Sequence, residues 1–106
     1  MRNPVRFASV EFNNNRLALY CAQHGCCAVT KEPLMIGEIH CHHKKPRNQD
    51  GNDKYSNLVL VSESVHILIH ATNPDVIAKY SRILGLNDKQ KGKMNNLRAK
   101  VGLYAI

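Results

Sequence analysis

Two pairs of histidines are the residues whose types and spacing could do chemistry in this chain. His66 and His70 lie one helical turn apart, and His42 and His43 are neighbours further upstream; five of the six histidines fall within residues 40–70. Imidazole has an unperturbed pKa close to neutrality and is the commonest metal ligand in proteins. This concentration predicts metal binding, acid–base chemistry or both.

A spacing of four residues places His66 and His70 on one face of a helix, within reach of one ion. Taken alone, such a pair is more often a partly buried structural pair than a metal site. A third ligand from the segment that holds His42 and His43 would change that balance. Three protein ligands leave positions open for water or phosphate, as a catalytic metal requires.

The elements that must position these histidines can be predicted from the pattern around them. Residues 36–43 alternate as a strand, 44–56 are dense in turn-forming polar residues, and 58–61 form a short apolar strand. Ser62 is a good N-cap for a helix over about 62–71. The apolar residues of this helix that we expect to face the core are Val65, Leu68 and Ile69.

The flanks predict further helices. Residues 1–11 are expected to be a tether, and a helix over 16–22 could be capped by Asn14 or Asn15. Residues 27–30 are a short strand candidate.

Two helices are expected after the central segment. Asn73, followed by a proline and an acid, is a strong helix start, and Gly85 should end that helix. Asn87 and Gln90 have the spacing of a capping box for the last helix. The stripe of the last helix that should face the core is Met94, Leu97 and Val101. We expect its cationic side chains to form a solvated face: Lys89, Lys91, Lys93, Arg98 and Lys100.

The bulk composition narrows the classes of partner. The 106 residues suffice for one domain with a modest core, and 15 Lys+Arg against 8 Asp+Glu give a net charge of +7, which favours polyanions. No apolar run approaches the roughly 18 residues of a membrane span, and the first residues do not resemble a signal peptide. We therefore expect a cytoplasmic protein without membrane contact, whose cysteines are thiols or ligands and not disulfides.

The segment Glu38–His70, EIHCHHKKPRNQDGNDKYSNLVLVSESVHILIH, resembles HNH endonucleases of the ββα-metal fold. The three letters of that motif fall on His43, Asn57 and His66. With the upstream CAQHGCCAVT and the ending LNDKQKGKMNNLRAKVGLYAI, roughly residues 16–106 are similar to the C-terminal endonuclease domain of group II intron-encoded reverse transcriptase/maturase proteins.

The resemblance implies an α+β fold with a ββα-metal core at about 36–71. In that core a short β-hairpin packs on a helix, flanked by an N-terminal helix and two C-terminal helices. The domain would span 12–106, after a tether at 1–11.

The resemblance also implies a role for each site residue. His43 would be the general base, and His42, His66 and His70 would hold one divalent metal ion. Asn57 would hold the loop and orient His43. Magnesium or manganese is implied in activity, whereas an all-histidine site also binds zinc or nickel readily.

Two further expectations concern the neighbourhood of His43. In a regular strand His42 and His43 point to opposite faces, so their joint use implies that the strand bulges or twists there. The adjacent cationic side chains are candidates for phosphate contact with nucleic acid: Lys44, Lys45 and Arg47.

Other histidines and the cysteines receive ordinary roles. His24 and His40 are expected to be surface or packing residues. The chain has no C-x-x-C pair, so a four-cysteine zinc site is not favoured. We expect all four cysteines to be small core residues: Cys21, Cys26, Cys27 and Cys41.

The leading functional interpretation is a metal-dependent DNA endonuclease that nicks a DNA target strand in group II intron mobility. Its partners would be DNA and, through a larger parent protein, intron RNA. The alternative is a non-cleaving nucleic-acid-binding module with a structural metal. A third interpretation is a small regulatory or structural protein with a histidine-rich core, which would hold no metal at stoichiometric occupancy.

Overall fold

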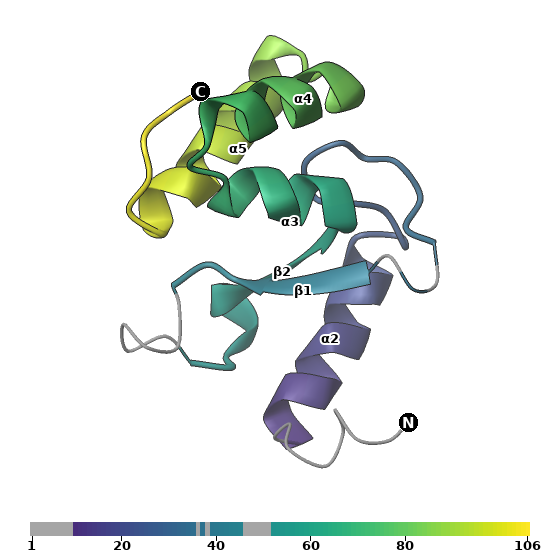
Figure 1. The fold of residues 1–106 in the computed structure, drawn as a ribbon. Helices are drawn as coiled ribbons and strands as arrows, with labels where there is room; N and C mark the ends of the chain where they lie inside the picture. Colours follow the sequence, from purple (N-terminus) through teal and green to yellow (C-terminus); the bar gives the residue numbers. More distant parts are fainter. Residues whose placement is uncertain (1–9, 36, 38, 46–51) are drawn as a thin grey trace.

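The computed structural model describes residues 10–35, 37, 39–45 and 52–106, and Figure 1 gives the labels used below. Within these ranges the chain forms four α-helices, one short 3-10 helix and one two-stranded antiparallel sheet. In chain order they are α2 (Val10–Ala22), β1 (Ile39–His43), η2 (Tyr55–Asn57), β2 (Leu58–Ser62), α3 (Glu63–His70), α4 (Pro74–Leu84) and α5 (Asp88–Lys100).

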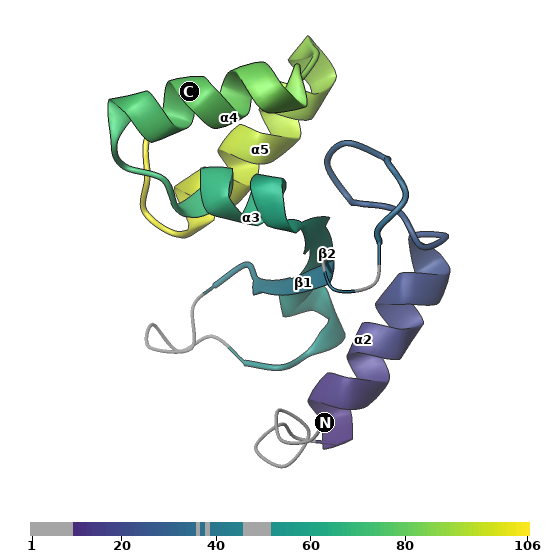
Figure 2. The same cartoon turned by 45° about the vertical axis from the view of Figure 1, so that its right-hand side comes forward.

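The elements are arranged in layers around the hairpin. Helix α3 packs on one face of the β1–β2 sheet, and α2 contacts the hairpin from the other side (Figure 1). Helices α4 and α5 lie on the side of α3 away from the sheet, as the turned view in Figure 2 also shows. This is the predicted α+β fold, a short hairpin on a helix with one N-terminal and two C-terminal helices. None of the described helices is long and apolar enough to cross a membrane.

The core lies between the hairpin and α3. All four apolar residues of β2 are buried, and they belong to the same core as Val65, Leu68 and Ile69 of α3, which are fully enclosed as predicted. Met94 and Leu97 of α5 are buried in the same core, while Val101 is only partly buried against it. The described part of the chain therefore has one continuous hydrophobic cluster.

The predicted helix boundaries after the hairpin are confirmed by their capping contacts. The Ser62 hydroxyl accepts a hydrogen bond from the Val65 amide at the start of α3, and the Asn73 side chain caps α4. Gly85 ends α4 in the left-handed conformation, with φ 55°. At α5 the side chains of Asn87 and Gln90 form the reciprocal capping box.

The N-terminal helix begins earlier than predicted. Helix α2 starts at Val10 and runs through Asn14 and Asn15, so neither asparagine is its cap. The Asn15 amide instead donates to the Asp53 carbonyl oxygen at 2.8 Å, a tertiary contact that offsets the low helix propensity of asparagine. The predicted tether at 1–11 is thus wrong for residues 10 and 11, and residues 1–9 lie outside the described ranges.

Residues 27–30 form a turn and not the predicted strand. An isolated bridge joins Cys26 to Pro33, and the Ala28 amide donates to the Leu60 carbonyl oxygen. The Gln23 side chain satisfies Leu60 further, because it donates to the Leu60 carbonyl oxygen and accepts from the Leu60 amide. The Gln23 side chain therefore makes the two backbone hydrogen bonds at Leu60 that a third strand would make at this edge of β2.

Arg98 is the main correction to the predicted solvated face of α5, because it is only 3% exposed. Its Nη1 donates to the carbonyl oxygens of Leu68 at 2.6 Å and Ala71 at 2.9 Å, and its Nε donates to that of Tyr104 at 2.8 Å. Two of these acceptors are carbonyl groups at the C-terminal end of α3, where a helix leaves its carbonyl groups short of partners; the Leu68 oxygen also accepts from the Ala71 amide at 3.3 Å. Arg98 thus fastens α5 to the end of the helix that carries His66 and His70.

We expect Arg98→Met to lower the free energy of unfolding by about 3 kcal/mol, because buried carbonyl groups lose a charged donor while the apolar stem is kept. Urea denaturation followed by circular dichroism measures the change. Arg82→Met on the exposed surface of α4 is the matched control and should change stability by roughly 0.5 kcal/mol or less. Equal effects of the two substitutions would contradict this role for Arg98.

Candidate metal centre

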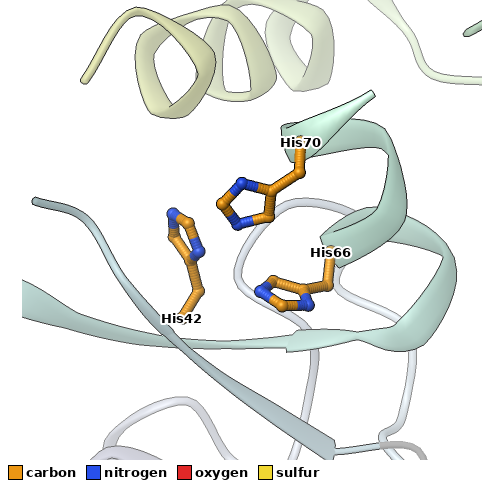
Figure 3. A group of neighbouring side chains, drawn as sticks. All are labelled: His42, His66 and His70. Atoms are coloured by element: carbon orange, nitrogen blue, oxygen red, sulfur yellow. The ribbon is translucent and has the colours of Figure 1, made fainter. Parts of the chain in front are cut away.

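Three of the predicted ligands meet at one point between the hairpin and α3. His42 comes from β1, and His66 and His70 come from successive turns of α3. One nitrogen of each ring lies within 4.8 Å of the other two, and Figure 3 shows the three rings converging on a common space. The structure therefore brings together a group of three histidines that could hold a metal ion.

The three nitrogens could hold a divalent ion after a small adjustment of the rings. Nitrogens about 2.1 Å from one tetrahedral ion lie about 3.4 Å apart, so a shift of roughly 1 Å in ring positions would suffice. His42 is only 2% exposed, and its Nε2 is buried without a hydrogen-bond partner in the described structure. A buried nitrogen without a partner carries a free-energy cost that a metal ion would remove.

The environment keeps the cluster in the neutral form that binds metals. Burial, followed by the charges of His70 and His66, lowers the pKa of His42 from 6.5 to about 3. Burial and then the charge of His70 lower the pKa of His66 to about 4, and burial also lowers the pKa of His70. At neutral pH an ion would therefore displace few protons from these rings.

The cluster is closed on one side and open on the other. His42 is enclosed, His66 is half-buried, and His70 at the end of α3 is exposed. Three protein ligands with one exposed edge leave room for a further, non-protein ligand on an ion held there.

His40 is a neighbour of the cluster that sequence reasoning set aside. Its ring stacks on that of His66, with centroids 5.1 Å apart and planes at 23°. His40 and His42 are two residues apart on β1, so both face α3. The alternation of histidines along residues 40–42 was the signal that could have predicted this contact.

His43 lies on the opposite face of β1 from His42. The pairing runs without interruption from Ile39 opposite Ser62 to His43 opposite Leu58, so the expected bulge is absent from the described strand. The His43 ring stacks on Phe12 of α2, with centroids 5.6 Å apart, and its Nε2 lies 2.9 Å from Oδ1 of Asp53. Regular pairing explains this placement, because successive residues of a strand alternate between faces.

The structure thus separates the predicted base from the three predicted ligands. His43 is still near enough that its charge contributes to lowering the pKa of His42. Asp53 is the partner that sequence reasoning missed, since it lay unremarked among the polar loop residues.

Asn57 closes the loop between the two strands. Its side chain accepts from the Lys45 amide at 2.9 Å and donates to the carbonyl oxygens of Lys45 and Asn52. Its own carbonyl oxygen accepts from the Lys44 amide. Among the described residues its hydrogen bonds go to backbone groups and not to the His43 ring, so any effect on His43 passes through the backbone.

The remaining candidates fall in different places. Lys44 is half-buried and Lys45 exposed beside Asn57, whereas Arg47 lies outside the described residues. Cys27 is buried, as expected of a core residue, but Cys21 is exposed, which contradicts that expectation. Cys21 lies in the last turn of α2 and is exposed there.

Comparison with known proteins finds no relative of this chain. No protein-family model, no curated protein and no solved structure matches the chain. The fold and the site together define the chain as an α+β domain in which a hairpin and a helix bring three histidines together.

We expect the apoprotein to bind about one zinc or nickel ion per chain and to gain about 10 °C in melting temperature at a hundredfold excess of ion over the dissociation constant. His70→Ala should remove most of this gain, because the exposed side chain contributes a ligand and little packing. Metal analysis after dialysis and a thermal melt measure both effects.

His24→Asn is the control for this experiment, since His24 is exposed, does not belong to the three-histidine group, and has a positive φ of 55° that asparagine tolerates. Metal binding that survives in His70→Ala at full affinity would contradict the three-histidine site.

We also expect the metal-free protein to lose stability as the pH falls. The unfolded histidines take up protons near pH 6.5, whereas His42 and His66 resist protonation down to about 3 and 4. The unfolded state therefore binds more protons, so stability is full above pH 6.5 and declines toward pH 4. Melting temperatures in a chelator between pH 7.5 and 5 measure the slope, which His66→Gln should flatten; a slope unchanged in that variant would contradict this cause.

Proposed function

We propose that this chain is a metal-dependent DNA endonuclease of HNH type that hydrolyses phosphodiester bonds. The observation that carries the proposal is the group of three histidines on β1 and α3, with nitrogens within 4.8 Å of one another and an exposed edge at His70. The resemblance of residues 16–106 to the endonuclease domain of group II intron-encoded proteins supports the choice of reaction.

His42, His66 and His70 would hold the ion. When bound, a divalent metal supplies Lewis-acid stabilisation of charge on the phosphate and on the leaving oxygen. Burial of His42 and half-burial of His66 keep water from competing for these nitrogens on the closed side. The open side at His70 is where a phosphate could approach.

His43 would be the general base. Asp53 is an ionisable carboxylate and can only accept, so the hydrogen of the 2.9 Å contact is on Nε2 of His43 when Asp53 is charged. Nδ1 is then the nitrogen free to take a proton from water. In many enzymes the base that activates a water or another nucleophile is itself oriented by a further side chain, as Asp53 would orient His43. The ring stack on Phe12 fixes the plane of the imidazole.

The biological setting follows from the resemblance. The substrate would be a DNA strand nicked in group II intron mobility, with magnesium or manganese in activity. Intron RNA would be reached through a larger parent protein, in the cytoplasm. Asn57 would hold the loop that carries Lys45.

One observation favours the alternative of a non-cleaving nucleic-acid-binding module with a structural metal. The His43 ring is occupied by Phe12 and Asp53 on the face of β1 away from the three-histidine group. In that case His43 would be a packing residue, and its loss would change stability and not a reaction rate.

A nicking assay on supercoiled plasmid separates the two functions. With added magnesium, manganese, zinc or nickel, we expect the wild type to nick and His43→Ala to be slower by roughly 100- to 10,000-fold, because a positioned base is lost. Metal affinity should be unchanged in His43→Ala and reduced in His66→Ala.

His24→Asn serves again as the control, which should nick like the wild type. A silent wild type in every metal, or a His43→Ala variant that nicks normally, would favour the binding module.

A further inference from the structure

Five lysines line two adjoining hollows beside the hairpin. The first, of about 290 Å³, is lined by Lys31, Lys44, Lys93 and Lys100, and the second, of about 260 Å³, by Lys44, Lys45 and Lys100. Because Lys44 and Lys100 belong to both, the hollows form one continuous surface, here called the lysine groove. No acidic side chain of the described residues lines either hollow.

The charge of the lysine groove is not neutralised within the described structure. None of its five lysines forms an ion pair there. Lys31 and Lys93 line the first hollow together, although they come from different segments of the chain. Neighbouring ammonium groups repel each other, so an anion that bridged them would be bound favourably.

The lysine groove lies beside the three-histidine cluster. Val59 lines the first hollow and is also the residue paired with His42 across the hairpin. Lys44 lines the same hollow and directly follows His43, the last residue of β1. A polyanion held in the groove would therefore pass close to the histidines.

We propose that the lysine groove binds the sugar–phosphate backbone of duplex DNA and leads it to the three-histidine cluster. The lysines are spread over two hollows and three segments, which suits a row of phosphates better than one small anion. Lysine acts as a mobile point charge, suited to backbone contact without sequence reading. The net charge of +7 agrees with such a partner. The inference rests on the proposed function for the identity of the polyanion.

The test uses two double variants that remove the same charge. Lys93→Gln/Lys100→Gln removes two lysines of the groove on α5, and Lys79→Gln/Lys91→Gln removes two lysines that line neither hollow. Glutamine keeps a helix propensity close to that of lysine, so both variants should fold. Binding to a short DNA duplex is measured in a chelator at several salt concentrations.

We expect the groove variant to reduce the slope of log affinity against log salt by about 2, since each lost phosphate contact contributes about 0.9. Its affinity at 0.1 M salt should fall roughly 10- to 100-fold, and the control variant should change far less. Equal losses in both variants would overturn the proposal, as would tighter binding to duplex RNA or to anionic lipid vesicles than to DNA.

Metal-free binding keeps this test separate from the nuclease reaction. DNA binding that depends on the groove, in a protein that never nicks, would support the groove and reject the endonuclease. If both double variants nick normally and the salt dependence of DNA binding is unchanged, the endonuclease is supported and the role of the lysine groove is rejected.

Discussion

The direct passage from β2 into α3 at Ser62 is the constraint on which the rest of this structure depends. Ser62 is the last residue of β2, paired with Ile39, and its hydroxyl also caps α3. With no loop between strand and helix, α3 must turn back over the sheet at once. The face of α3 that carries His66 and His70 then comes to lie over the part of β1 that carries His42 (Figure 3).

Burial has opposite consequences for structure and for chemistry at this point. The packing of β2 against Val65, Leu68 and Ile69 removes apolar surface from water and stabilises the fold. The same packing encloses His42, leaves its Nε2 without a partner, and lowers its pKa to about 3. A buried neutral imidazole destabilises the metal-free protein below neutral pH, yet it is the form in which imidazole binds a metal ion.

The last helix links this centre to the remaining surface. Arg98 donates to the carbonyl oxygens of Leu68 and Ala71 at the end of α3, so the position of α5 and the orientation of α3 depend on each other. Two residues further along α5, Lys100 lines the same hollow as Lys44. One helix therefore both fastens the helix that carries two histidines and contributes to the cationic surface beside them.

The sequence by itself determined the hairpin, the three helices that follow it, and the pairing of His66 with His70 on one helical face. Periodicity predicted the hairpin and its helix, the caps at Ser62, Asn73 and Asn87 were predicted from local hydrogen-bonding rules, and the spacing of His66 and His70 predicted a shared face. These features depend on residues close in sequence, so local chemistry suffices to predict them.

Only the tertiary structure decided the features that depend on contacts between residues far apart in the sequence. Contacts with Asp53 extend α2 through Asn15, and Gln23 replaces a third strand at Leu60. Regular pairing of β1 turns His43 toward Phe12 and away from His42, and the C-terminus of α3 draws Arg98 into the interior. In each case a polar or aromatic group met a partner far along the chain, a pairing that no local pattern contains.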